Sequence, residues 1–371
     1  MDKDIYFDYA ATTPVDPAVL EVMIPYFNEK FGNASSSTHS YGWQAKEAVN
    51  YSQRLIAENI GAEAKEIVFT SGATESINIA IKGVFDRYQT KGNHIISCET
   101  EHKSTLDTLK HLEQKGARIT YLPVDKDGRV SLKSVEDAIC DDTILISVMW
   151  INNETGVIQN IKQIGAIANK FNVLFMCDAT QAVGKVKIDV KENNISLMAF
   201  SAHKIYGPKG IGALYASRKN PRVSLSAYIH GGSQENTLRA GTLNTPSIVA
   251  FGKAISLLEN KQEAEKITLL SDKIKKYLTD QGGVVNGLST CPHIINVQFL
   301  GSNAVSLLKV NKHFCFSLGS ACSSESLEPS HVLRAMDLSV KAVKSSFRIS
   351  IGRMTTTEEV NRFIKEFKLN S

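Results

Sequence analysis

Lys204 is the residue whose type and setting most directly suggest covalent chemistry. It follows the apolar run Leu197–Ser201, within the segment Phe200-Ser201-Ala202-His203-Lys204. An ammonium group beside a buried strand is costly to desolvate unless it is paired or used. Because desolvation lowers the pKa of a lysine, such a side chain can form a Schiff base with a carbonyl compound. The setting alone still allows Lys204 to be an ordinary lysine.

A carboxylate stands at the end of another apolar run. Asp178 follows Val173–Cys177, which is predicted to be a buried strand. In open α/β sheets, ligands bind at the carboxyl ends of the strands, so Asp178 could pair there with a cationic ring nitrogen. The same aspartate could equally serve as a helix N-cap.

The segment Thr70–Ser76 follows an apolar run and is expected to open a helix. Such a junction presents backbone N–H groups and the positive end of the helix dipole to an anion. Gly72 would let the backbone come close, and the hydroxyls of Ser71 and Thr74 would add donors. An ordinary N-cap without a ligand is the alternative interpretation.

These residues need a scaffold, and the region from about residue 60 to 220 predicts one. Short apolar runs alternate there with amphipathic segments near 104–114 and 161–171, as in a mostly parallel sheet covered by helices. The last two runs are separated by about ten residues, too few for a crossover helix, which predicts one antiparallel neighbour. The predicted strands are Ile67–Phe69, His94–Ser97, Ile144–Trp150, Val173–Cys177, Leu197–Ser201 and Ile211–Ala216.

After residue 258 the pattern changes to that of a smaller α+β domain. We predict a polar helix near 260–281, strands at Ile294–Phe299 and Ser346–Ile351, and a helix at Ala304–Val310. A last helix is expected to open with a capping box from Thr355 to Glu358. We expect a large domain of residues 15–258 and a small domain of residues 1–14 and 259–371.

The composition is that of an ordinary globular protein, with 371 residues, 43% hydrophobic, 22% charged and a net charge of +4. The basic residues are scattered, which argues against direct nucleic-acid binding. No apolar run approaches the roughly 18 residues of a membrane span, and the charged N-terminus has no secretory pattern, so a cytoplasmic protein is expected. The six cysteines form no CxxC pair, and most are expected to be buried in apolar settings, Cys140 and Cys177 among them.

Taken together, the ordered motifs resemble the NifS/IscS-type cysteine desulfurases, class-V aminotransferases of the pyridoxal-phosphate (PLP) fold type I. The resemblance runs from Tyr6 almost to the C-terminus. It implies an α/β fold with a mostly parallel central sheet, helices on both faces, and a smaller α+β domain that carries a catalytic-cysteine loop. The motifs that carry it are Phe31–Ser36, Thr70–Asn78, Asn152–Gly156, Ser201–Gly210, Arg239–Thr242, Ser317–Leu333 and Arg348–Arg353.

The resemblance implies that pyridoxal 5'-phosphate is carried on Lys204 in the large domain. Asp178 would pair with the pyridinium nitrogen, Gln181 would bond the phenolic oxygen, and His102 would stack on the ring. The residues implied to hold the phosphate are Ala73, Thr74, Ser201, His203 and, from the other subunit of a homodimer, Thr242.

For the reaction, the resemblance implies conversion of L-cysteine to L-alanine. Arg348 would clamp the substrate carboxylate with its planar guanidinium, and Asn153 would lie near ring and substrate. Lys204 would move protons, and His102 would assist as acid or base toward the sulfur.

Cys322 lies in the small, polar segment Leu318–Ser326. By resemblance it would accept the sulfur as a persulfide and pass it to an acceptor protein, either an iron–sulfur scaffold or a tRNA-thiolation enzyme. No intrinsic metal is implied, although Cys322 could ligate a transient iron–sulfur cluster. The following Leu327–Ser330 matches the subgroup with the longer catalytic loop.

Besides a small change at Ala202, where Gly or Ser is common, the chain departs from the family pattern at two places. Trp150-Ile151 stands where Met-His or a similar pair is common, and the sequence stops at Ser371, before the stretch with which housekeeping members dock the scaffold. Scaffold docking is therefore in doubt. Two rival functions remain: a selenocysteine lyase or other PLP-dependent β-elimination enzyme, and a non-catalytic binding or regulatory paralogue.

Overall fold

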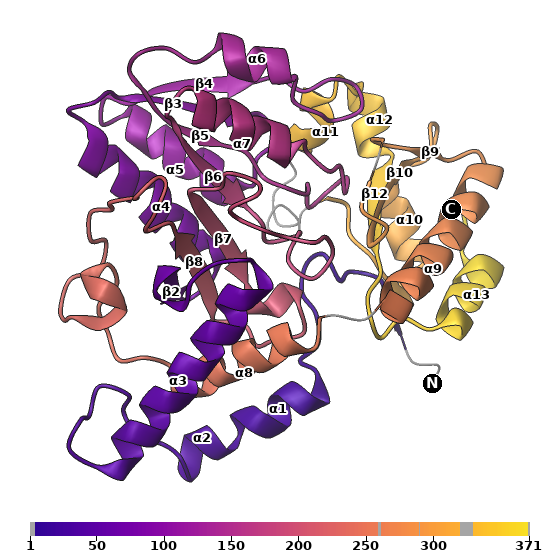
Figure 1. Cartoon of the computed structure of the whole chain (residues 1–371). Coiled ribbons are helices and arrows are strands. Elements are labelled where there is room, and N and C mark those ends of the chain that lie inside the picture. The colour runs from indigo at the N-terminus through magenta and orange to yellow at the C-terminus, as the bar shows by residue number, and fades with distance from the viewer. Residues whose placement is uncertain (1–3, 259–260, 289, 320–328, 370–371) are drawn as a thin grey trace.

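The computed structural model describes residues 4–258, 261–288, 290–319 and 329–369 (Figure 1). Its largest sheet has seven strands in the order β2-β8-β7-β6-β5-β3-β4. The neighbours from β7 through β4 are parallel, whereas β8 is antiparallel to both β7 and β2. The strands are β2 (Ile67–Thr70), β3 (His94–Cys98), β4 (Arg118–Leu122), β5 (Thr143–Ser147), β6 (Leu174–Asp178), β7 (Leu197–Ser201) and β8 (Gly212–Ala216).

Successive residues of these strands belong to two different hydrophobic cores. On β7, Met198 and Phe200 pack into one core, whereas Leu197 and Ala199 pack into the other. Because neighbouring side chains point to opposite faces of a strand, both faces of the sheet are buried. This explains the continuous apolar runs, which are typical of parallel sheets covered by helices.

The helices divide between the two faces. One core takes side chains from α3 (Ser40–Asn59), α7 (Ile161–Lys170) and α8 (Thr245–Ser256), and the other from α4 (Ala73–Tyr88) and α5 (Lys103–Glu113). The shorter helices of this part are α1 (Pro17–Met23), α2 (Pro25–Asn28) and α6 (Leu132–Asp137). The predicted α/β architecture is therefore confirmed, including the antiparallel neighbour formed by β7 and β8.

A second body is built around the antiparallel sheet β12-β10-β9 and a separate, phenylalanine-rich core. Phe7 of the N-terminal segment lies in this core, and β1 (Ile5–Tyr6) pairs in parallel with β11 (Phe314–Cys315). We therefore propose that residues 1–14 belong with 259–371, as the sequence predicts. The remaining elements are β9 (Val284–Val285), β10 (Ile294–Gln298), β12 (Ser346–Ser350), α9 (Lys261–Asp280), α10 (Ala304–Val310), α11 (His331–Ala335), α12 (Val340–Lys344) and α13 (Thr357–Glu366).

Strand β4 is absent from the sequence prediction. It lies at the edge of the sheet, and its residues Arg118–Tyr121 are exposed or half-buried, so the segment lacks a purely apolar run.

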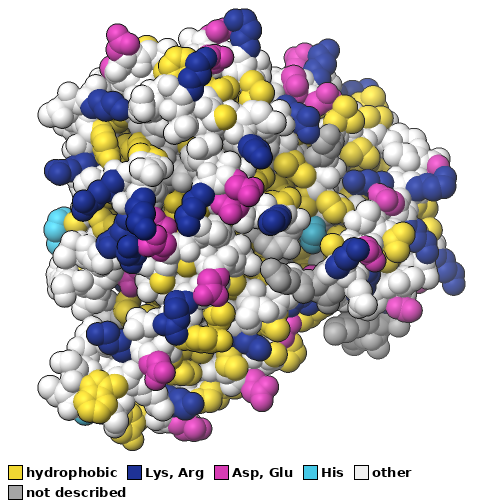
Figure 2. All heavy atoms as spheres, in the orientation of Figure 1, with side chains coloured by type: hydrophobic (Ala, Val, Ile, Leu, Met, Phe, Trp, Pro, Cys, Tyr) yellow, Lys and Arg dark blue, Asp and Glu magenta, His cyan; other side chains and the backbone are white. Residues whose placement is uncertain are grey.

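On the face shown in Figure 2, basic and acidic side chains are interspersed. No helix in the described part of the chain is both long and apolar enough to cross a membrane.

The capping box of α13 lies one residue later than predicted. The hydroxyl of Thr356 accepts a hydrogen bond from the Glu359 N–H at 3.1 Å, and the Glu359 carboxylate accepts one from the Thr356 N–H at 2.9 Å. Thr355 is instead fully buried, and its hydroxyl accepts from the Gly352 N–H. The repeated Thr-Thr-Thr-Glu-Glu letters fit both registers, and burial of Thr355 selects one.

We predict that Thr356→Ala lowers the free energy of unfolding by about 1 kcal/mol, because the N-terminal amides of α13 lose their side-chain acceptor. Glu358→Ala is the matched control, since Glu358 takes no part in the reciprocal pair. Denaturant unfolding measures both. Equal losses in the two variants would show that α13 is not capped through Thr356.

Candidate active site

A cavity of about 350 Å³ opens where the strands of the large sheet end. Its polar lining comes from the segments that follow β2, β3, β5, β6 and β7, together with Arg348 of β12. Parallel strands bring their carboxyl ends to one edge of a sheet, so residues distant in sequence meet there. The predicted site residues that line the cavity are Ala73, Thr74, His102, Asn153, Asp178, Gln181, Ser201, His203, Lys204 and Arg348.

Lys204 lies in a short 3-10 turn directly after β7. Its ammonium nitrogen donates hydrogen bonds to the carbonyl oxygens of Ala10 and Ala11, at 2.7 and 2.6 Å. These carbonyls satisfy the charge that the sequence alone left without a partner. The N-terminal segment therefore reaches across the chain to hold this amine at the cavity.

The start of α4 lies at the cavity, where Gly72, Ala73 and Thr74 form part of the lining. Its N-cap is Gly72, which has no side chain to cap the helix, and the hydroxyl of Ser201 accepts from the Ala73 N–H at 2.7 Å. A Cβ atom on Gly212 would lie only 2.6 Å from the Cα of Gly72, so the two backbones approach as closely as glycines allow. An ordinary side-chain N-cap does not explain this junction.

His203 lies beside this helix start, and its Nδ1 is 3.1 Å from the hydroxyl of Thr12. Burial, with smaller contributions from the charges of Lys204 and Lys209, lowers the pKa of His203 to about 4. The imidazole is therefore neutral at physiological pH. It can donate or accept a hydrogen bond without adding a charge.

Asp178 is not a helix N-cap, because turns rather than a helix follow β6, and its pairing with a ring nitrogen stays a prediction. It lines the cavity, and its Oδ1 accepts a hydrogen bond from the Thr180 N–H at 2.9 Å. Within the described part of the chain, the buried hydroxyl of Thr180 has no hydrogen-bond partner. Such an unsatisfied group beside a cavity favours a bound polar ligand.

Gln181 is held in one orientation by two partners. Its side-chain NH₂ donates to the carbonyl oxygen of Ala10 at 2.8 Å, and its side-chain oxygen accepts from Lys185 at 2.5 Å. Lys185 as a residue is half-buried, but its ammonium group points inward, and burial lowers its pKa to about 8. The sequence interpretation missed Lys185, although its spacing of four residues from Gln181 was a usable signal.

His102 is the N-cap residue of α5. Its Nδ1 accepts from the Ser104 N–H at 3.1 Å and lies 2.7 Å from the Ser104 hydroxyl. In the neutral ring this leaves the proton on Nε2. The preceding Glu101 is fully buried, and burial raises the pKa of its carboxyl group well above the usual range.

Arg348 is 1% exposed and bound on two sides. One terminal nitrogen donates to Asp8 at 2.6 Å, and the other donates to the backbone oxygen of Asn153 at 2.7 Å. A guanidinium has five N–H groups, so hydrogen-bonding capacity remains for an anion. Asp8 was missed by the sequence interpretation, because nothing in the sequence pairs residues 340 positions apart.

Cys322 and its neighbours 320–328 lie outside the described residues. The chain on either side of them is anchored beside the cavity. Ser317 and Arg348 exchange backbone hydrogen bonds, and after the gap Ser330 donates to the carboxylate of Glu154 at 2.6 Å. His331 also contacts the backbone oxygen of Glu101 at 2.9 Å.

The structure leaves the expectation for Thr242 untested and contradicts the expectation for Cys140. Thr242 is exposed and does not line the cavity of its own chain, so its role from another subunit stays a prediction. Cys98, Cys177 and Cys291 are buried as expected, but Cys140 is exposed. The expectation of an apolar setting for Cys140 is wrong, because its thiol lies against His94 and Asp142 at the other edge of the sheet.

Comparison with known proteins places this arrangement in a family. Residues 5–363 match the profile described as "Aminotransferase class-V". "Cysteine desulfurase IscS" of Anaeromyxobacter sp. (strain Fw109-5) is 50% identical, over 98% of this chain and 92% of the relative. The solved structure "NIFS-LIKE PROTEIN" matches with a TM-score of 0.91 and 34% identity over 98% of both chains. "SspA in complex with cysteine" matches with a TM-score of 0.83 and 37% identity, over 95% of this chain and 100% of that one.

The buried ammonium of Lys185 predicts a specific dependence of stability on pH. Between pH 8 and about 10.5 the unfolded chain holds a proton that the folded chain has released, so the free energy of unfolding rises with pH. For a fully enclosed group the rise would be roughly 3 kcal/mol, and solvent near the half-buried side chain reduces it to about 1–3 kcal/mol.

Lys185→Met should lose this rise, because no group titrates at that position. The measurement is denaturant unfolding at pH 8 and pH 10, with exposed Lys187→Met as the control that keeps the wild-type slope. If Lys185→Met and wild type gain the same stability between these pH values, the ammonium of Lys185 is not desolvated.

Proposed function

The chain belongs to the class-V aminotransferase family and is a cysteine desulfurase, and we propose that it acts through PLP held in the cavity and a persulfide on Cys322. The observation that carries the proposal is the convergence of Lys204, Asp178 and Arg348 on one cavity. An amine, a carboxylate and a buried guanidinium at the carboxyl edge of an α/β sheet suit a cationic ring and an amino-acid substrate.

The residues of the cavity fit PLP chemically. The positive end of the α4 dipole at Gly72 and Ala73 suits a phosphate, and a Cβ on Gly212 would push into that backbone. The unsatisfied Thr180 hydroxyl also favours a polar occupant. When bound, PLP supplies an electron sink for the α-carbon of the substrate.

Each predicted site residue has a proposed task toward the cofactor. Lys204 would carry it, Asp178 would pair with the ring nitrogen, and the fixed NH₂ of Gln181 would donate to the phenolic oxygen. Lys185 would hold Gln181 in that orientation. The remaining proposed contacts are His102 on the ring, Asn153 near ring and substrate, Ala73, Thr74, Ser201 and His203 at the phosphate, and Thr242 from the second subunit of a homodimer.

Arg348 would bind the carboxylate of L-cysteine. Its two terminal nitrogens are already oriented by Asp8 and the Asn153 carbonyl, so little side-chain freedom is lost on binding. Lys204 would take the proton from the α-carbon and return it. The Nε2–H of His102, set by the contact of Nδ1 with Ser104, would exchange a proton with the substrate sulfur.

The thiolate of Cys322 would take the sulfur atom. An S–S bond forms as the bond between Cβ and sulfur breaks, and the electron pair left on the substrate carbon is protonated to give L-alanine. The anchored chain on both sides of the gap supports this assignment. Three peptide links separate Gly319 from Cys322, a span of at most about 10 Å.

The persulfide would then pass to an acceptor protein. An iron–sulfur scaffold and a tRNA-thiolation enzyme both remain candidates, and nothing among the described residues favours one of them. Radioactive cysteine sulfur, loaded onto the enzyme and offered to each purified acceptor in turn, separates the two.

The decisive experiment compares Cys322→Ala with wild type in the presence of L-cysteine. We expect the variant to lose persulfide and alanine formation by at least about a hundredfold, because the attacking thiolate is gone. Its PLP absorbance should be unchanged. Lys204→Ala should instead lose the absorbance of attached PLP.

Cys140→Ala is the matched control, because Cys140 is also exposed but lies at the opposite edge of the sheet. It should keep wild-type turnover. Full sulfur release from cysteine by Cys322→Ala would refute the persulfide route. Retained selenocysteine turnover in that variant would instead point to the rival lyase activity.

A second prediction concerns the ion pair between Asp8 and Arg348. Asp8→Asn should raise the KM for L-cysteine about tenfold, since a weakened charged hydrogen bond costs about 1.4 kcal/mol of binding. The turnover number and the PLP absorbance should change much less. Steady-state kinetics measures this, with exposed Asp4→Asn as the control. An unchanged KM would mean that Asp8 does not orient Arg348 for the substrate, and a lower KM would mean that Asp8 competes with the substrate.

A further inference from the structure

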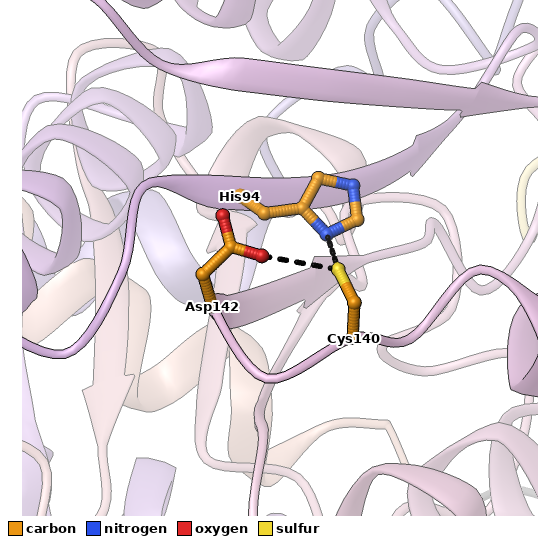
Figure 3. A group of neighbouring side chains, drawn as sticks. All are labelled: His94, Cys140 and Asp142. Carbon is orange, nitrogen blue, oxygen red and sulfur yellow. Dashed lines mark hydrogen bonds between the residues drawn. The ribbon is translucent and has the colours of Figure 1, made fainter.

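A second polar cluster lies at the amino ends of the parallel strands, the opposite edge from the cavity. His94, Arg118 and Thr143 are the first residues of β3, β4 and β5, and they are paired across the sheet. Cys140 and Asp142 come from the segment that leads into β5. Figure 3 shows the ring of His94 and the carboxylate of Asp142 both directed at the thiol of Cys140.

The spacing of the three side chains suits a tetrahedral metal ion. The sulfur of Cys140 is 3.2 Å from His94 Nδ1 and 3.1 Å from Asp142 Oδ1, and one ligand atom from each residue lies within 4.8 Å of the others. Bonds of about 2.3 Å to sulfur and about 2.0–2.1 Å to nitrogen and oxygen place tetrahedral ligands roughly 3.3–3.6 Å apart. The two sulfur distances are therefore within a few tenths of an ångström of this spacing, and the ring nitrogen and the carboxylate oxygen lie within 4.8 Å of each other.

Neighbouring hydroxyls already hold the nitrogen and sulfur in place. His94 Nε2 lies 2.8 Å from the hydroxyl of Thr120, the kind of outer contact that fixes a metal-binding imidazole. The Thr143 oxygen accepts from the Cys140 N–H at 2.9 Å and lies 2.8 Å from Nδ1 and 3.3 Å from the thiol. The hydroxyl hydrogen of Thr143 can therefore rotate from Nδ1 of His94 toward a thiolate at Cys140.

Arg118 shows that this cluster attracts a positive charge. One of its terminal nitrogens donates to Cys140 at 3.0 Å and to Asp142 at 2.7 Å. The Arg118 side chain is 50% exposed, so it can turn into solvent at little cost. The guanidinium and a metal ion would compete for the same two ligands.

We propose that His94, Cys140 and Asp142 bind a zinc-type divalent cation through Nδ1, the thiolate and one carboxylate oxygen, and that Arg118 leaves when the ion enters. The Cys140 thiol gives up its proton to solvent, and water takes the fourth position. Mixed nitrogen, sulfur and oxygen ligands favour Zn²⁺ over Mg²⁺ or Ca²⁺. The ion would clip the segment 140–142 to the rigid start of β3, as a structural site separate from the desulfurase reaction.

The test uses the PLP-loaded protein in a Cys322→Ala background, so that this cysteine cannot contribute a ligand. Zn²⁺ is titrated against a chromophoric chelator, and Co²⁺ is added separately to record the visible bands of a tetrahedral thiolate site. We expect one Zn²⁺ per chain, and a melting temperature that rises with Zn²⁺ because the ion binds the folded state. Adding Cys140→Ala should weaken binding at least about tenfold and remove the Co²⁺ bands.

Two further variants separate the proposal from simple surface binding. Asp142→Asn should weaken Zn²⁺ binding about tenfold or more, whereas Arg118→Met should tighten it several-fold by removing the competing cation. Cys315→Ala, at a half-buried cysteine of the second body, should bind as the parent does. Circular dichroism and PLP absorbance confirm that each variant is folded. Zn²⁺ affinity unchanged in Cys140→Ala, or weakened in Arg118→Met, would overturn the assignment.

Discussion

The buried guanidinium of Arg348 constrains the whole arrangement around the cavity. A cation that is 1% exposed must be paired, because leaving it alone in a low-dielectric interior costs several kcal/mol. Its partners come from two other parts of the chain: Asp8 from the N-terminal segment, and the Asn153 carbonyl from the segment after β5. The strand that carries Arg348 also bonds to Ser317, where the chain enters the segment of Cys322. One buried charge thus links the large sheet, the second body and the N-terminal segment beside the cavity.

The N-terminal segment makes further contacts of the same kind. Its carbonyls at Ala10 and Ala11 hold the ammonium of Lys204, and Ala10 also accepts from Gln181. Since Phe7, three residues earlier, lies in the core of the second body, this short stretch crosses between two hydrophobic cores. The proposed cofactor-carrying amine is therefore positioned by backbone groups that become available only when both bodies have folded.

The carboxyl and amino ends of the strands in the large sheet carry different polar groups, and the sheet topology explains why. The carboxyl ends of the strands lead into loops that carry the amine, carboxylate and amide groups of the cavity, and most of these groups are held by the N-terminal segment or by Lys185. The amino ends collect His94 and Thr143 with the half-exposed Arg118, next to Cys140 and Asp142. A parallel sheet separates these two sets by the length of its strands.

The sequence by itself determined the α/β architecture from its apolar runs, and its resemblance to a known family supplied most of the cavity residues. Continuous apolar runs require burial on both faces, and polar residues that directly follow parallel strands must meet at one edge, so the positions of Lys204 and Asp178 followed from local pattern. Tertiary structure alone decided the partners: Asp8 for Arg348, Lys185 for Gln181, and His94 for Cys140. It also decided which threonine caps α13 and left Arg118–Leu122 as a half-exposed edge strand. These outcomes depend on which surfaces pack together over separations of up to 340 residues, and a local pattern of residue types contains no information about that packing.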